Sequence, residues 1–125
     1  MLFKAVNHVA IIVSDYEVSR DFYVNKLGFE VINEQWREAN NDWLIRLMAP
    51  SGVELEVFAK SNAPKRITNP EAQGLRHLAF EVEDVDAAVE ELSKIGIPCE
   101  PVRLDGTHKY TFFKDPDGLP LEIRD

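Results

Sequence analysis

The stretch His8-Val9-Ala10-Ile11-Ile12-Val13 decides the fold of this chain, because its pattern returns later as His77-Leu78-Ala79-Phe80-Glu81-Val82. In each copy an aspartate follows the histidine by seven residues, at Asp15 and at Asp84. Both stretches are mostly apolar and contain side chains that favour strands. Matched spacing over two such stretches indicates that the chain contains a duplicated unit.

A second shared pattern closes each copy. Gly52-Val53-Glu54-Leu55-Glu56 in the first half matches Gly118-Leu119-Pro120-Leu121-Glu122 in the second, with the last glutamate four residues after the glycine in both. That glutamate lies 48 residues after the opening histidine in the first copy and 45 residues after it in the second. One histidine and one glutamate in register in each copy predict a four-ligand metal site, formed by His8, Glu56, His77 and Glu122.

The predicted order of elements is βαβββ in each half. We expect strands at residues 6–13, 29–32, 43–48 and 53–58, and again at residues 77–82, 99–104, 110–113 and 119–124. A helix follows the first strand of each half, with Ser14 as N-cap and Glu17 completing a capping box in the first half, and with Asp84 as N-cap in the second. The nearly continuous apolar run at residues 6–13 predicts a strand that is buried on both faces.

The length of 125 residues predicts a single domain built from two small modules. We place module 1 at about residues 4–58 and module 2 at about residues 75–125. Residues 59–74 are polar and contain two prolines, so we interpret them as the linker. The mixture of helices and strands in each module predicts the α+β class.

The amino-acid composition argues against some classes of binding partner. The formal net charge of -8 argues against nucleic acid and against anionic membrane surfaces, since both need clustered Lys and Arg. No apolar run approaches the roughly 18 residues of a membrane span, and the N-terminus lacks the pattern of a signal peptide. A single cysteine, Cys99, cannot form an internal disulfide. These features favour a cytoplasmic protein that acts on a small molecule.

Strand parity selects between two neighbouring glutamates. The apolar residues at 53, 55 and 57 share one face of their strand, which leaves Glu54 and Glu56 on the other. Only Glu56 matches Glu122 by its distance from the turn glycine, so the repeat selects Glu56. Imidazole and carboxylate together suit Ni, Zn, Co, Mn or Fe, and four protein ligands leave room for water or substrate on a divalent ion.

Each of these side chains also has an ordinary structural interpretation. His8 could be a hydrogen-bonded core histidine, and Glu56 and Glu122 could be solvated strand residues. The arrangement of all four at repeated positions favours the metal site, because buried His and Glu without partners would cost free energy.

The chain resembles the vicinal oxygen chelate superfamily and, within it, the glyoxalase I-like proteins. The stretches that carry the resemblance are residues 8–15, Phe22-Tyr23, Leu27-Gly28-Phe29, Glu56-Val57-Phe58, residues 74–80, and Phe112-Phe113-Lys114-Asp115-Pro116-Asp117-Gly118 leading to Glu122. The resemblance implies paired βαβββ modules that form a curled eight-stranded sheet around a metal. In that superfamily the ligands come from the first and last strand of each module, which are the positions of His8, Glu56, His77 and Glu122.

A glutamate at both last-strand positions is most similar to glyoxalase I. The resemblance implies a metal-dependent lyase or isomerase that acts on the hemithioacetal of a small 2-oxoaldehyde and a thiol. Glu56 or Glu122 would move a proton through an enediolate that the metal stabilises. The alternatives are another metal-dependent enzyme of this superfamily, of the epimerase or dioxygenase type, and a non-catalytic protein that binds a small ligand.

The sequence allows more than one role for the residues that could surround the site. Arg20, Arg37, Arg76 and Lys109 could bind substrate carboxylates or be surface charges, and His108 could line the pocket or be an exposed loop residue. Trp36 and Trp43 could wall the pocket, pack in the core or form a dimer contact. We expect a homodimer, with the four ligands drawn from one chain or from two.

Overall fold

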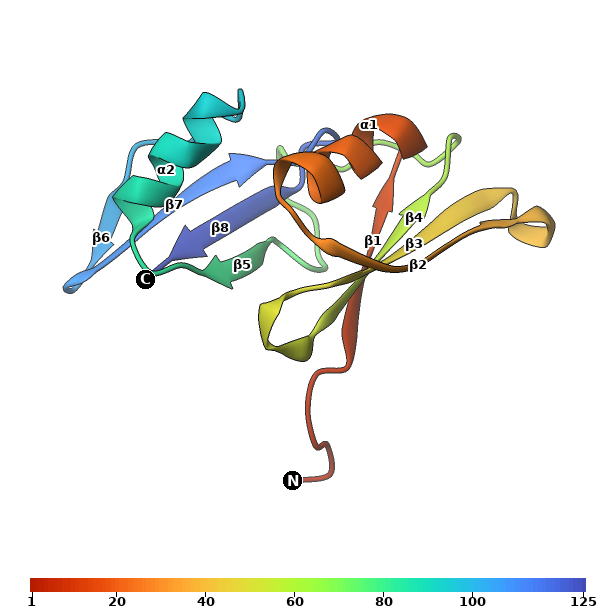
Figure 1. The fold of residues 1–125 in the computed structure, drawn as a ribbon, viewed down its shortest axis with the longest axis horizontal. Helices are drawn as coiled ribbons and strands as arrows, with labels where there is room; N and C mark the ends of the chain where they lie inside the picture. The colour runs from red at the N-terminus through yellow and green to blue at the C-terminus, as the bar shows by residue number, and fades with distance from the viewer. The chain divides into compact units, whose positions relative to one another are not determined.

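The computed structural model describes residues 1–125 and consists of two compact units, Met1–Pro64 and Lys65–Asp125. Each unit contains one four-stranded sheet and one main helical segment, as Figure 1 shows. The predicted α+β class with paired four-stranded modules is confirmed, and the eight strands form two sheets, one in each unit. No helix in the structure combines the length and the apolar character that crossing a membrane requires.

The first unit contains the elements of the first copy of the repeat. They are β1 (His8–Val13), α1 (Tyr16–Arg20), the π-helix η1 (Asp21–Lys26), β2 (Glu30–Arg37), the 3₁₀ turn η2 (Glu38–Asn40), β3 (Asp42–Met48), η3 (Pro50–Gly52) and β4 (Glu54–Ala59). The strand order is β1-β4-β3-β2, so the first and last strands are neighbours. They run parallel, with His8 opposite Glu54 and Ala10 opposite Glu56. This pairing brings the two ends of the repeat onto one part of the sheet.

Strand β1 is buried on one face only, so the expectation of burial on both faces is wrong. Ile11 and Val13 are in the core, whereas Ala10 is exposed and the side chain of Ile12 is 58% exposed. The sequence does not show this alternation of buried and exposed positions. Ala and Ile are at the outward positions, where a half-buried strand usually has polar residues. His8 is on the same open face as Ala10 and Ile12, which leaves its ring accessible.

The first helix begins one residue later than predicted. Asp15, and not Ser14, is its N-cap, with the Asp15 Oδ1 atom accepting from the Val18 amide at 3.0 Å. The α-helix then widens into a π-helix, in which the Leu27 amide donates to the Phe22 carbonyl at 2.9 Å. Gly28, at φ 82°, takes the left-handed conformation that ends the helical segment.

Contacts with β2 and β3 hold the first helix on the sheet. The ring of Tyr16 stacks on Trp43 with centroids 4.3 Å apart. The Tyr16 hydroxyl and the Arg20 Nε atom both donate to the Glu34 carboxylate, at 2.8 and 2.7 Å. The helix therefore covers the face of the sheet that carries Glu34 and Trp43.

The second unit repeats the strand order of the first. Its elements are β5 (Leu78–Glu81), α2 (Val85–Lys94), β6 (Arg103–Asp105), β7 (His108–Lys114) and β8 (Pro120–Arg124), arranged as β5-β8-β7-β6. Strands β5 and β8 are parallel neighbours, with Ala79 opposite Glu122. Asp84 caps α2 as predicted, since its Oδ1 atom accepts from the Ala87 amide at 3.0 Å. Helix α2 lies along β7 (Figure 1).

Strand β6 is shorter than the predicted strand at residues 99–104. Pro101 has no amide proton, so it cannot contribute a donor to a ladder with β7. The segment before β6 is held by separate bonds instead. The Glu100 amide donates to the Phe112 carbonyl at 2.9 Å, and the Thr111 hydroxyl donates to the Glu100 carbonyl at 2.7 Å. Regular pairing begins only at Arg103, opposite Tyr110.

Candidate metal and substrate site

The first His–Glu pair lies on the open face of the first sheet. His8 begins β1 and Glu56 lies in the middle of β4, and the His8 Nε2 atom is 3.8 Å from the Glu56 Oε1 atom. The His8 side chain is 44% exposed and the Glu56 side chain 19% exposed. The two side chains expected to act together in module 1 therefore face each other.

The ring of His8 is oriented for ligation through Nε2. The side-chain oxygen of Asn7 lies 2.8 Å from His8 Nδ1, and an amide oxygen can only accept a hydrogen bond. In the neutral imidazole the proton is then on Nδ1 and the lone pair is on Nε2, which faces the Glu56 carboxylate. Two acceptor atoms that face each other favour a cation or a proton between them.

The separation of these two atoms tests whether a divalent ion fits. An ion bound to nitrogen and oxygen at about 2.0–2.2 Å places neighbouring ligand atoms about 3 to 3.5 Å apart. The observed 3.8 Å between Nε2 and Oε1 needs only a small rotation of either side chain to reach that range. The donor set and its spacing therefore fit the ion that the family resemblance implies.

Glu54, the alternative on the same strand face, has a different partner. The Arg46 Nη2 atom lies 2.9 Å from both carboxylate oxygens of Glu54, while Arg46 Nε is 3.9 Å from Glu56. Arg46 thus binds Glu54, and one carboxylate oxygen of Glu56 faces His8. Of the two glutamates on this strand face, Glu56 is therefore the one that faces His8.

The second His–Glu pair lines a pocket in the second unit. His77 immediately precedes β5, Glu122 lies in β8, and both border a cavity of about 360 Å³. Glu122 is 8% exposed, and its ion pair is with Arg124, whose Nη1 atom is 3.9 Å from Oε2. A buried carboxylate needs such charge partners. The edge of the His77 ring meets Phe112, with centroids 5.1 Å apart and the planes at 83°.

The two pairs occupy equivalent places in the two sheets. Each glutamate is opposite an alanine of the first strand of its unit, Ala10 for Glu56 and Ala79 for Glu122. A small side chain at that position leaves room beside the carboxylate. Nowhere in the structure do three or more His, Cys, Asp or Glu side chains gather into a metal-binding group. Each unit therefore contributes two potential ligands, which is fewer than a protein metal site normally uses.

Each of the four candidate substrate-binding cations has a carboxylate partner, including Arg76, whose Nε atom donates to Glu71 at 2.7 Å. Arg20 binds Glu34, Lys109 forms an ion pair with Asp86, and Arg37 binds Asp42 through two bonds of 2.7 Å. The Asp42 side chain is fully buried, and the hydrogen bonds from Arg37 lower its pKa to about 2. The fourth cation, Arg76, borders the same pocket as His77.

The two tryptophans pack away from the first His–Glu pair. Trp43 is opposite Ala59, whereas Glu56 is opposite Arg46, so Trp43 and Glu56 point to opposite faces of the sheet. Trp36 is opposite Trp43 and meets it edge to face, with centroids 5.8 Å apart. The tryptophans belong to the helix-covered face and do not wall the His8–Glu56 site.

Two arginines of the second pocket were missed by the sequence reasoning. Arg103 and Arg124 both border the cavity with His77 and Glu122. Parity alone could have found Arg124, which lies two residues after Glu122 and on the same face. Arg103 could not be placed, because the strand that carries it begins later than predicted. His108, the other candidate pocket residue, does not border this cavity. Its Nδ1 atom is 3.4 Å from the Asp125 Oδ1 atom, and its side chain is 63% exposed.

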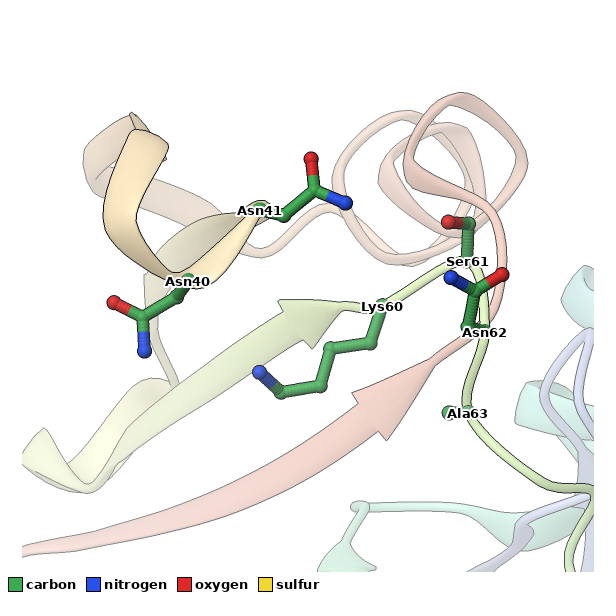
Figure 2. A pocket seen from close by; sticks show the side chains of 6 residues that line it. All are labelled: Asn40, Asn41, Lys60, Ser61, Asn62 and Ala63. Carbon is green, nitrogen blue, oxygen red and sulfur yellow. The ribbon is translucent and has the colours of Figure 1, made fainter.

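A separate cavity of about 270 Å³ in the first unit is made by turn residues. Figure 2 shows Lys60 extending beneath the turn that carries Asn40 and Asn41, with residues 61–63 on the other side. Lys60 donates a hydrogen bond to Asp42 at 2.5 Å, so its positive charge compensates the buried carboxylate. No His, Asp or Glu lines this cavity, and it is not the candidate site.

Comparisons with known proteins agree with the fold. The family model described as the glyoxalase/bleomycin resistance protein/dioxygenase superfamily matches residues 5–123. The uncharacterized protein YwkD of Bacillus subtilis (strain 168) is 50% identical, over 98% of this chain and 98% of that protein. Lactoylglutathione lyase of Pseudomonas putida is 27% identical, over 94% of this chain and 82% of that protein.

A solved structure extends the similarity to three dimensions. The glyoxalase family protein from Enterococcus faecalis superposes with a TM-score of 0.94 at 47% identity, and the match covers 100% of both chains. The sequence repeat, the two matching sheets and the family match all lead to the same assignment. The chain belongs to the glyoxalase/bleomycin resistance protein/dioxygenase superfamily.

Proposed function

We propose that this protein is a metal-dependent lyase or isomerase of the glyoxalase I type, acting on the hemithioacetal of a small 2-oxoaldehyde and a thiol. One observation carries the proposal: each unit presents a His–Glu pair at the same position, His8 with Glu56 and His77 with Glu122. The similarity to the lactoylglutathione lyase of Pseudomonas putida supports the reaction class.

The four side chains would hold one divalent ion, of Ni, Zn, Co, Mn or Fe. When bound, the ion supplies positive charge that stabilises negative charge on substrate oxygens. Since one unit offers only two ligands, the proposal requires a pair from each of two units, in one chain or in two.

The chain's own contribution to the reaction is proton transfer. Glu56 or Glu122 takes the proton from the carbon that carries the thiol and returns it to the neighbouring carbon, so that the hemithioacetal becomes a hydroxy thioester. The hydroxyl proton of the first carbon passes to the oxygen of the neighbouring carbon, which becomes the new hydroxyl, so no proton is gained or lost overall. Glu122 is 8% exposed, so little solvent reaches that carboxylate.

The test combines metal analysis with an assay of thioester formation. Protein purified without chelator should contain a divalent ion and should convert the hemithioacetal of methylglyoxal with at least one thiol. Glu56→Gln and Glu122→Gln remove a carboxylate without changing its size. Loss of the general base should lower kcat by about 10²–10⁴-fold.

Glu54→Gln is the matched control, because Glu54 lies on the same face of the same strand and is bound by Arg46. It should retain both metal and activity. Metal-loaded protein that forms no thioester with any of several thiols would contradict the glyoxalase proposal. Exchange of a substrate proton without thioester formation would indicate an epimerase instead. Ligand binding that is unaffected by His77→Ala would indicate a non-catalytic binding protein.

Assembly and location belong to the same proposal. We propose a homodimer, to be measured by sedimentation velocity, and a cytoplasmic location, to be measured by cell fractionation. A small-molecule substrate, as a thiol adduct, is the proposed ligand in either assembly.

A further inference from the structure

Two guanidinium groups lie on aromatic rings in the second pocket. The Arg103 guanidinium carbon is 5.8 Å from the Phe112 ring centre, and that of Arg124 is 5.8 Å from the Tyr110 ring centre. The two rings meet edge to face, with centroids 6.2 Å apart, and Phe112 also contacts His77. A cation within about 6 Å of a ring centre is attracted to the face of the ring. Both cations are therefore held beside the His77–Glu122 pair.

The residues that line the pocket include more cations than carboxylates. Arg76, Arg103 and Arg124 border it together with only two carboxylates, Asp105 and Glu122, whereas the whole chain has a formal net charge of -8. A concave site with an excess of one charge concentrates ligands of the opposite charge.

Arg103 and Arg124 both have N–H groups that a ligand can use. Arg103 binds Glu100 through Nη2 at 2.8 Å, and Arg124 binds Asp105 through Nη2 at 3.0 Å. A guanidinium has five N–H donors, and ion pairs between exposed side chains are weak enough for a ligand to replace them. The Glu100 and Asp105 side chains are 46% and 66% exposed, so both can turn away into solvent.

The equivalent positions of the first unit do not provide such a site. The residue opposite Glu56 is Arg46, where Phe112 is opposite Glu122, and Phe58 replaces Arg124. The arginines of that unit are held by close carboxylates, Arg37 by the buried Asp42 and Arg46 by Glu54. The partners of Arg103 and Arg124 are the more exposed carboxylates Glu100 and Asp105, at 46% and 66%, whereas Asp42 is buried and Glu54 is 19% exposed.

We propose that Arg103 and Arg124 bind an oxyanion of the ligand, a carboxylate or a phosphate, next to the His77–Glu122 pair. Arginine recognises either group through parallel N–H donors. The claim that this ligand is the substrate rests on the proposed function, whereas the anion site itself can be measured without turnover.

The binding test follows the guanidinium Nε–H signals of the ¹⁵N-labelled full-length protein by NMR. The probes are propionate, inorganic phosphate and uncharged propionamide, each titrated with and without the divalent ion. Propionate or phosphate should shift the Arg103 and Arg124 signals saturably, and propionamide should not. The stronger of the two anions identifies the chemistry of the ligand group.

Variants assign the effect to the two arginines. Arg103→Gln and Arg124→Gln should each weaken anion binding about tenfold, as expected for loss of a charge-assisted hydrogen bond. Arg20→Gln is the matched control, because Arg20 belongs to α1 of the first unit and its side chain is 34% exposed, close to the 36% of Arg124. Unchanged affinity in the Arg103 and Arg124 variants, or equal weakening by Arg20→Gln, would overturn the proposal. The amide spectrum of each variant verifies that it is folded.

Turnover separates this inference from the proposed function. Arginine-dependent anion binding without any thioester formation would refute the lyase and leave the anion site standing. Thioester formation with the same kcat/KM in the wild type and in the Arg103→Gln/Arg124→Gln variant would refute a role for the site in substrate binding and leave the lyase standing.

Discussion

Asp42 is a carboxylate without solvent contact at the start of β3. Arg37 and Lys60 neutralise it, at 2.7 and 2.5 Å, and the Arg37 guanidinium also lies over the Phe58 ring at 4.8 Å. The hydrogen bonds from Arg37 lower the pKa of Asp42 to about 2, from an ordinary value of 3.8. Asp42 therefore links the β2–β3 turn to the end of β4.

The depressed pKa predicts how the stability of the protein depends on pH. The contribution of Asp42 is fully present above its unfolded pKa and is lost as the pH falls from about 4 toward 2. A shift of this size corresponds to about 2 kcal/mol, and screening at the partly exposed partner cations reduces it to about 1 kcal/mol. Urea unfolding of the wild type between pH 7 and pH 2 measures this loss.

Asp42→Asn should destabilise the protein at pH 7 by about 1 to 3 kcal/mol, because two cations lose their charge partner. The difference between variant and wild type should shrink between about pH 4 and pH 2, as Asp42 takes up a proton first in the unfolded wild type and then in the native protein. Glu90→Gln, at a 73% exposed position of α2, is the control and should change stability by less than about 0.5 kcal/mol. A difference that stays constant down to pH 2 would contradict the assignment.

The site residues show what a sequence can and cannot predict at this scale. The repeat and strand parity were sufficient to pair His8 with Glu56, because side-chain alternation in a strand follows from the backbone alone. The arginines of the second pocket needed the register of β6 against β7, which depends on how Pro101 interrupts the ladder. The alternation of side chains predicts which face of its own strand a residue occupies. Which residue lies beside it on the next strand is known only from the tertiary structure.

At the scale of elements, the N-cap of α2 is the clearest local signal. The Asp84 carboxylate accepts the Ala87 amide, one of the amides that a helix start leaves without an intrahelical partner. Asp84→Ala should therefore destabilise the protein by about 1 kcal/mol in urea unfolding. Asp84→Asn keeps the acceptor and should cost much less. Equal losses for Ala and Asn would show that the charge, and not the cap, matters.

Element boundaries were predictable where one strong signal was present and less so where two signals were adjacent. Asp84 had no competitor and was assigned correctly. Ser14 and Asp15 are both good N-cap residues, and the spacing to Glu17 favoured Ser14, whereas the backbone places Asp15 in the extended conformation before the helix. The π-helical widening at Asp21 had no sequence signal at all, because the same apolar positions suit an α-helix.

For the whole molecule, the proposed metal site makes the two His–Glu pairs interdependent. His8→Ala/Glu56→Ala and His77→Ala/Glu122→Ala each remove one pair and leave the other intact. If the four ligands share one ion, each double variant should lose essentially all bound metal, measured by elemental analysis. Retention of half the metal in both variants would mean that each pair binds its own ion.

Mixing the two double variants then shows which chains provide the ligands. If a site combines pairs from two chains, a mixed dimer regains one complete site, and metal binding returns to as much as half the wild-type level per dimer. If both pairs come from one chain, the mixture stays without metal at every ratio. Sedimentation velocity on the same mixture verifies that dimers have exchanged subunits.

The sheet order of each unit also has a consequence for synthesis on the ribosome. In both units the strand made first, β1 or β5, pairs with the strand made last, β4 or β8. No nascent unit can close its sheet until its final strand has left the exit tunnel. The last strand of the first sheet nevertheless ends at Ala59, before the first strand of the second sheet at Leu78, so the whole first sheet leaves the tunnel first. Vectorial synthesis therefore separates the two copies in time, and it protects similar strands from pairing with the wrong copy.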